Sequence, residues 1–178
     1  MLFRSIYYGD EIGMGDNINL GDRNGVRTPM QWSGGRNGGF STANPERLYA
    51  PLIEDPVYGY PAVNVLRQTE TEHSLLHWMR RMITVRRSTA VFGRGSIEFL
   101  YPASHRILAY VRRLGSEAVL VVNNLSSTAQ AVELDLRRYK GNILIEMSGM
   151  NIFPRVSDLP YLLTMGPYQF YWFWLRRI

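Results

Sequence analysis

Apolar and polar residues alternate with a period of two along the second half of the chain. This period is typical of strands that bury one face. Turn residues such as Gly, Asn, Ser and Pro separate the alternating segments at a spacing of about 8–12 residues. Seven segments predict strands, at residues 96–101, 106–112, 118–123, 130–136, 143–147, 161–164 and 168–175. Seven short strands predict an antiparallel β-sandwich that runs from about residue 92 to residue 178.

The last of these segments is aromatic on both faces. Phe170, Trp172 and Trp174 alternate with Tyr171 and Phe173. A strand that is apolar on both faces is usually buried on both, which predicts a central strand or one packed against the preceding domain. A platform on which sugars stack is the alternative, and core packing is the favoured reading.

A helical period precedes the strands. Thr69 and Glu72 have the spacing of a capping box, which predicts the start of a helix that ends near Ser88. Its apolar residues recur at intervals of three and four: Leu75, Leu76, Met79, Met82 and Ile83. We expect one amphipathic helix whose apolar face needs a partner.

The first 68 residues show little periodicity. Residues 6–8 predict a short buried strand, and glycines and prolines then mark an irregular path to about Gln68. Irregular segments longer than about 15 residues are uncommon in compact domains, unless they are functional loops on a scaffold. We therefore expect this stretch to carry function.

Composition removes several classes of function. The chain of 178 residues has 46% hydrophobic residues and no cysteine, so it can form a core but neither disulfides nor thiolate metal sites. Its net charge of +5 comes from scattered arginine doublets rather than a basic run between exposed aromatics, which argues against nucleic-acid binding. The absence of cysteine is consistent with a reducing compartment, so we expect a cytoplasmic protein. No segment approaches the roughly 20 apolar residues of a membrane span, so we expect no membrane partner.

Four sequence motifs carry a resemblance to a known family. YYGDEIGM begins at Tyr7, GDRNGVRTPMQW ends at Trp32, and DPVYGYPAVNV and LLHWMRRMITVR follow in that order. Together they resemble the end of the catalytic barrel in the α-amylase superfamily of glycoside hydrolases, above all its trehalose synthase branch, the maltose α-D-glucosyltransferases. The resemblance covers nearly the whole chain.

The resemblance implies an α+β fragment. Residues 1–91 would supply the last strand, a long loop and the last helix of a (β/α)8 barrel, and residues 92–178 the C-terminal β-sandwich. A complete barrel needs about 250 residues, so this length cannot hold one. In the family, catalytic carboxylates lie on earlier strands and convert maltose to trehalose by intramolecular glucosyl transfer. The chain alone is then expected to be inactive, with no catalytic residue and no cofactor of its own.

Two arginines are the candidate substrate-binding residues. Arg23 and Arg27 stand four apart, and a guanidinium offers five donors that suit a carboxylate or the neighbouring hydroxyls of a sugar. The resemblance implies that one pairs with an upstream aspartate at the closed end of a glucose pocket. Arg23 is then the sugar-contacting residue and Arg27 its structural neighbour. Two arginines that only pin the loop remain the alternative.

The acids of the loop predict structural roles. Asp10 and Glu11 are adjacent, and adjacent strand residues point to opposite faces, which argues against a catalytic carboxylate pair. The resemblance implies that Asp10, Glu11 and Asp22 organise the loop. Asp16, Asn17, Asn19 and Asp22 offer hard oxygen atoms, but their spacing fails the EF-hand pattern, so we expect no metal.

Two alternatives for the function remain open, and two partners are expected. The parent could instead be an oligo-1,6-glucosidase-like hydrolase, or the sandwich a stand-alone carbohydrate-binding module. The expected partners are a maltose- or trehalose-type disaccharide and the missing N-terminal part of the barrel. Without that part, the exposed apolar face of the helix predicts a homo-oligomer.

Overall fold

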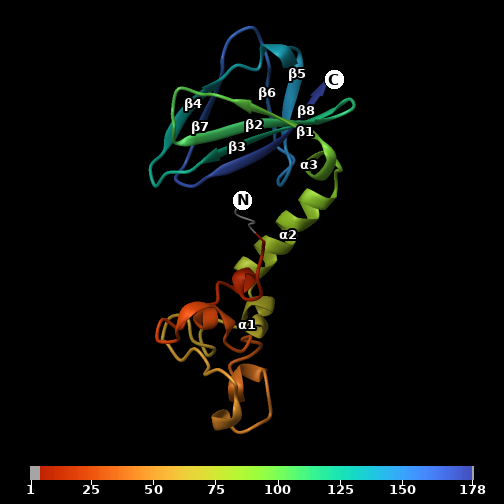
Figure 1. Ribbon diagram of the computed structural model, residues 1–178. Coiled ribbons are helices and arrows are strands. Elements are labelled where there is room, and N and C mark those ends of the chain that lie inside the picture. The colour runs from red at the N-terminus through yellow and green to blue at the C-terminus, as the bar shows by residue number, and fades with distance from the viewer. Residues whose placement is uncertain (1–4, 178) are drawn as a thin grey trace. The chain divides into compact units, whose positions relative to one another are not determined.

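A computed structural model describes residues 5–177 and divides the chain into two compact units, Met1–Met82 and Ile83–Ile178 (Figure 1). The first unit has little regular structure. It contains four 3₁₀ turns, η1 (Asp10–Ile12), η2 (Asp22–Arg27), η3 (Arg36–Gly39) and η4 (Pro45–Arg47), followed by helix α1 (Val65–Glu70). Helix α2 (Leu75–Arg87) crosses the division between the units.

The predicted strand at residues 6–8 is wrong. Residues 5–7 have no regular structure, a turn begins at Tyr8, and Ile6 and Tyr7 are exposed. A strand exists only where a neighbour pairs with its backbone, and no strand is found anywhere in residues 5–95. The apolar run therefore has the composition of a barrel strand without the partners that would make it one.

The single helix predicted for residues 69–88 is also wrong in detail, because it is two helices. α1 begins at Val65, where the Asn64 side chain accepts a hydrogen bond from the backbone N–H of Arg67 at 2.9 Å. Residues 71–74 interrupt the helix. Ser74 then caps α2, because its side chain accepts from the N–H of His77 at 3.3 Å. Asn64 and Ser74 are thus the capping residues, in place of the Thr69–Glu72 box.

The second unit is the predicted antiparallel β-sandwich, preceded by the short helix α3 (Val91–Arg94). Six strands form a sheet in the order β1-β2-β3-β8-β5-β6, and β4 pairs with β7 in a second sheet. Their bounds are β1 Ser96–Leu100, β2 Ile107–Leu114, β3 Glu117–Asn124, β4 Gln130–Leu134, β5 Asn142–Glu146, β6 Ile152–Arg155, β7 Tyr161–Met165 and β8 Phe170–Arg177. Every strand pairing is antiparallel. Strand β6 was not predicted, and it lies at the edge of the large sheet, where its Pro154 is tolerated.

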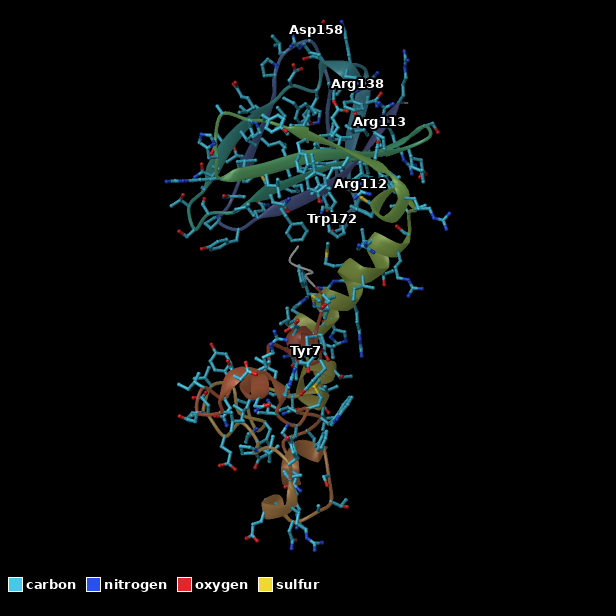
Figure 2. The ribbon with its side chains drawn as sticks, in the orientation of Figure 1. Tyr7, Arg112, Arg113, Arg138, Asp158 and Trp172 are labelled. Carbon is cyan, nitrogen blue, oxygen red and sulfur yellow. The ribbon has the colours of Figure 1, made fainter. Side chains whose placement is uncertain are left out.

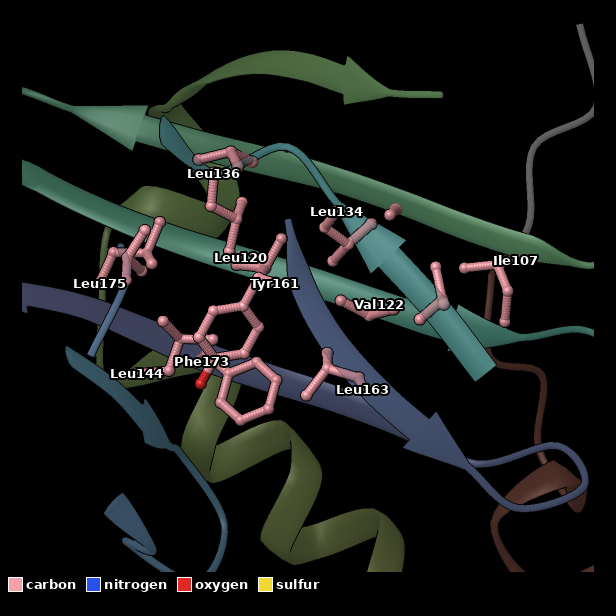
Figure 3. Packing of buried hydrophobic residues seen from close by; sticks show 14 of the residues in the cluster. Ile107, Leu120, Val122, Leu134, Leu136, Leu144, Tyr161, Leu163, Phe173 and Leu175 are labelled. Atoms are coloured by element: carbon pink, nitrogen blue, oxygen red, sulfur yellow. The ribbon is translucent and has the colours of Figure 1, made fainter. Parts of the chain in front are cut away.

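The core lies between the two sheets. Phe173 and Leu144 of the large sheet pack in one buried cluster with Tyr161 and Leu163 of β7 (Figure 3). β8 is central in its sheet, between β3 and β5, as its aromatic pattern predicts. Its other face is half-buried: Trp172 packs against Phe92 with ring centroids 4.7 Å apart (Figure 2).

The buried hydroxyl of Tyr161 makes the free energy of unfolding depend on pH in the alkaline range. The hydroxyl of Tyr161 donates to the carbonyl of Pro154 at 2.9 Å, and burial raises its pKa from 10.0 to about 12. The unfolded chain loses this proton first, so the contribution to stability is complete below pH 10 and is lost as the pH rises towards 12. The urea concentration at the unfolding midpoint should therefore fall as the pH rises from 10 to 12, and it should fall less in Tyr161→Phe. Tyr168→Phe, at an exposed tyrosine, should show the same fall as the parent chain, and equal slopes for both variants would contradict the assignment.

Candidate functional site

Two acids of the loop bind its own backbone. The Asp10 carboxylate accepts from the N–H of Tyr7 at 2.8 Å, and the Glu11 carboxylate accepts from the N–H of Gly9 at 2.9 Å. Gly9 has a φ of 95°, which side chains disfavour, and a Cβ there would meet Met14 at 2.9 Å. These bonds are what a loop-organising role requires. They also occupy both carboxylates with main-chain donors.

Asp22, the third of the predicted loop-organising acids, has no such backbone partner for its carboxylate among the described residues. It is exposed, its φ is 53°, and its carboxylate makes no side-chain hydrogen bond or ion pair with residues 5–177. Aspartate tolerates this backbone conformation better than most residues. Its loop-organising role stays a prediction.

The arginines lie on a 3₁₀ turn, which separates them. With 3.0 residues per turn, side chains four apart point about 120° away from each other, whereas an α-helix would align them. Arg27 accordingly lines a groove, and Arg23 is exposed and outside it. The sequence spacing alone does not reveal this divergence.

The groove beside Arg27 has a volume of about 460 Å³ and lies within the first unit. Aromatic rings dominate its walls: Tyr8, Trp32, Phe40 and Tyr49. Glu11 also lines it, so one carboxylate and one guanidinium face an otherwise apolar surface. A few polar groups among aromatic rings are typical of small-molecule sites.

Tyr8 fixes one wall of this groove. Its hydroxyl donates to the carbonyl of Thr28 at 2.9 Å, and its ring lies 4.6 Å from that of Tyr7. Burial and the neighbouring Tyr7 raise the pKa of Tyr8, and the charge of Arg27 opposes them. The phenol therefore stays neutral at physiological pH.

Gln31, which sequence reasoning missed, holds the opposite side of the loop in place. It is fully buried, and its amide nitrogen donates to the carbonyls of Tyr58 at 3.1 Å and Val63 at 2.5 Å. The backbone carbonyl of Gln31 accepts from the N–H of Val65 at 3.0 Å, at the start of α1. One side chain thus joins the groove-bearing segment to residues about thirty positions further on. The sequence signal for this buried role was the position of a single amide side chain between two large apolar residues, Met30 and Trp32.

Gln68 forms a second clamp. Its nitrogen donates to the carbonyl of Ile12 at 2.5 Å, and its oxygen accepts from the N–H of Leu76 at 3.0 Å. Ile12, Met30 and Leu76 form a buried hydrophobic cluster in this unit. The amide therefore closes a small core with hydrogen bonds where few apolar side chains are available.

The described residues do not assemble a metal centre. No group of three or more His, Cys, Asp or Glu side chains within residues 5–177 could hold a metal ion. Asn17 accepts from the N–H of Asn19 at 3.1 Å, so part of the polar segment serves its own turn. His77 likewise contacts the Thr71 carbonyl at 2.9 Å near the start of α2. Within these same residues, no helix has the length and apolar character of a transmembrane span.

Two family models match the chain. The catalytic domain of α-amylase matches residues 3–95, and the C-terminal domain of maltogenic amylase matches residues 97–172. The chain belongs to the α-amylase family. Its described part holds the end of the catalytic domain and the C-terminal domain, as the resemblance predicts.

The similar proteins include trehalose synthases. The chain is 56% identical to trehalose synthase from Pimelobacter over 94% of its length, and 52% identical to trehalose synthase/amylase TreS from Mycobacterium tuberculosis over 96%. It spans about 30% of the length of these relatives. Among solved structures, a trehalulose synthase mutant bound to Tris is 25% identical with a TM-score of 0.66, covering 90% of this chain and 27% of that one.

The clamp at Gln31 can be tested directly. Gln31→Ala leaves the carbonyls of Tyr58 and Val63 without their donor, which costs roughly 2–6 kcal/mol at about 1–3 kcal/mol per unsatisfied group. We expect the variant to expose the amides of Tyr58 and Val65 to rapid hydrogen exchange while the sandwich stays protected. Asn24→Ala, an exposed residue of the same loop, is the control. Unchanged exchange in Gln31→Ala would show that the clamp is dispensable.

Proposed function

We propose that this chain forms part of an enzyme that isomerises maltose to trehalose by intramolecular glucosyl transfer. Identity of 52–56% to trehalose synthases over nearly the whole chain is the observation that carries this proposal. Residues 1–91 would complete the barrel and residues 92–178 would form its C-terminal domain. The enzyme would act in the cytoplasm on a neutral disaccharide, with neither nucleic acid nor membrane as a partner.

The chemistry of the transfer explains what this chain would contribute. An aspartate nucleophile and a glutamate acid–base, both upstream in the family, form and resolve a glycosyl-enzyme. The released glucose must stay and turn in a closed pocket, because water would otherwise take the glycosyl group. The chain would supply one wall of that pocket. Its own Asp10 and Glu11 carboxylates are occupied by backbone donors, which supports structural roles for them.

The arginines would have different tasks. The Arg23 side chain makes no hydrogen bond or ion pair with residues 5–177, so its donors are available to the sugar and to a barrel carboxylate. Arg27 lies in the groove beside Glu11 and Tyr8, where it would support the wall. Asp22 would hold the turn that presents both.

A hydrolase is the second candidate. The mycobacterial relative carries both activities in its name, and an oligo-1,6-glucosidase-like enzyme would use the same arginine loop. The ratio of trehalose to free glucose among the products separates the two reactions. A stand-alone module that binds sugar through β8 is disfavoured, because Trp172 packs against Phe92 and Arg176 lies 4.9 Å from the ring centre of Trp174.

The activity test uses the chain alone and a chimera that joins it to the upstream barrel of the Pimelobacter enzyme. Proton NMR of maltose should show no turnover by the chain and trehalose from the chimera. Arg23→Ala in the chimera should lower kcat/KM by about 10²–10³-fold, because a buried carboxylate loses its partner and the sugar loses its donors. Arg36→Ala, which removes only a surface bond to Asn44, is the control. Turnover by the chain alone, or full activity of Arg23→Ala, contradicts the proposal.

A second test concerns the apolar face of α2. Leu75 and Ile83 are 40% and 41% exposed, and we propose that this face packs on the rest of the barrel. In the isolated chain it should drive homo-oligomers, whose mass by light scattering rises with concentration. Leu75→Gln with Ile83→Gln should restore a monomer, whereas Arg81→Gln on the same helix should not. A monomeric parent chain at all concentrations would refute this role.

A further inference from the structure

The strand-rich unit contains a cavity of about 440 Å³. One wall is formed by residues 98–102, at the end of β1 and just beyond it. The other is formed by residues 133–138, at the end of β4 and in the turn that follows. Its volume falls in the range of about 300–1,000 Å³ that is typical of small-molecule sites.

Two ion pairs hold the walls in place. Arg138, labelled in Figure 2, donates to Glu98 at 3.0 Å and joins the two walls, which are 40 residues apart in sequence. Arg137 binds Asp135 through two bonds, at 3.0 Å and 2.6 Å, and these bonds lower the pKa of Asp135 to about 2. Pairs this exposed add little stability, so their main effect is to orient the polar groups.

The polar groups keep hydrogen-bonding capacity for a ligand. Glu133 makes no side-chain hydrogen bond or ion pair with residues 5–177, and each guanidinium retains donors beyond those used in its pair. Three carboxylates and two guanidinium groups give the lining a net charge of −1. This balance disfavours a phosphate or other anion. It suits a neutral ligand that both donates and accepts, as neighbouring sugar hydroxyls do.

An aromatic ring completes the lining. Tyr101 is 91% exposed although it lines the cavity, so its ring stands at the mouth, and Phe99 of the same wall is 47% exposed. A single exposed tyrosine has no meaning by itself. A ring beside oriented carboxylates and guanidinium groups presents a stacking surface for the apolar face of a pyranose next to partners for its hydroxyls.

We propose that this cavity is a binding site for a neutral saccharide, with Tyr101 as the stacking platform and Glu133 and Arg137 as hydroxyl partners. The site lies in the second unit, whereas the groove beside Arg27 lies in the first. It therefore stands independently of the proposed isomerase activity.

The test is saturation-transfer difference NMR on the 178-residue chain with maltose and with trehalose. We expect binding with a Kd on the order of 1–10 mM, typical of a weak site. Tyr101→Ala should weaken it by about tenfold or more, and Tyr101→Phe should retain it because the ring remains. Tyr101 is exposed, so neither variant threatens folding. Glucose 6-phosphate should bind more weakly than maltose.

Two controls separate the sites. Tyr168→Asn removes another exposed tyrosine of this unit, and asparagine tolerates the φ of 52° found there. Tyr168→Asn should bind saccharide as the parent chain does. Tyr49→Ala alters the groove of the first unit and tests whether the saccharide binds there instead. No saturation transfer to the parent chain, undiminished binding by Tyr101→Ala, or loss only in Tyr49→Ala would each overturn the proposal.

Discussion

Hydrogen bonds from two side-chain amides, of the buried Gln31 and the part-buried Gln68, hold the first unit together. Its backbone forms no strand in residues 5–82, and its hydrophobic cluster has three buried residues, Ile12, Met30 and Leu76. Backbone groups inside such a unit still need partners, because leaving them unpaired costs as much as a lost hydrogen bond. Gln31 and Gln68 supply these partners across long sequence separations. The groove beside Arg27 depends on this arrangement, since Gln31 lies four residues after Arg27 on the same segment.

The second unit solves the same problem with strand pairing. Eight antiparallel strands satisfy the backbone, and a core shared by both sheets adds hydrophobic stabilisation. This contrast has a functional side. A loop fixed by a few specific bonds presents groups at its surface without a regular scaffold of its own, whereas a sandwich offers rigid edges, such as the one where Glu98 and Arg138 meet.

The sequence predicted the elements that depend on local patterns of apolar and polar residues. The period of two gave seven of the eight strands, because alternation follows directly from burial of one face, and the aromatic run placed β8 at the centre of its sheet. β6 escaped because it has four residues and a proline. The strand at residues 6–8 failed because residues 5–95 contain no strand that could pair with it. The break between the two helices followed from the caps at Asn64 and Ser74. The divergence of Arg23 and Arg27 required knowledge of the 3₁₀ turn. Which arginine meets a sugar remains a prediction.

We propose that this chain completes the pocket of a glucosyl-transferring barrel. Fragment complementation tests it most directly: the chain is mixed with the separately produced upstream portion of the Pimelobacter enzyme, and trehalose formed from maltose is followed by proton NMR. The account predicts that neither part is active alone, that activity appears on mixing, and that Gln31→Ala, which loosens the loop, greatly reduces it. Folded parts that associate but form no trehalose would contradict the account.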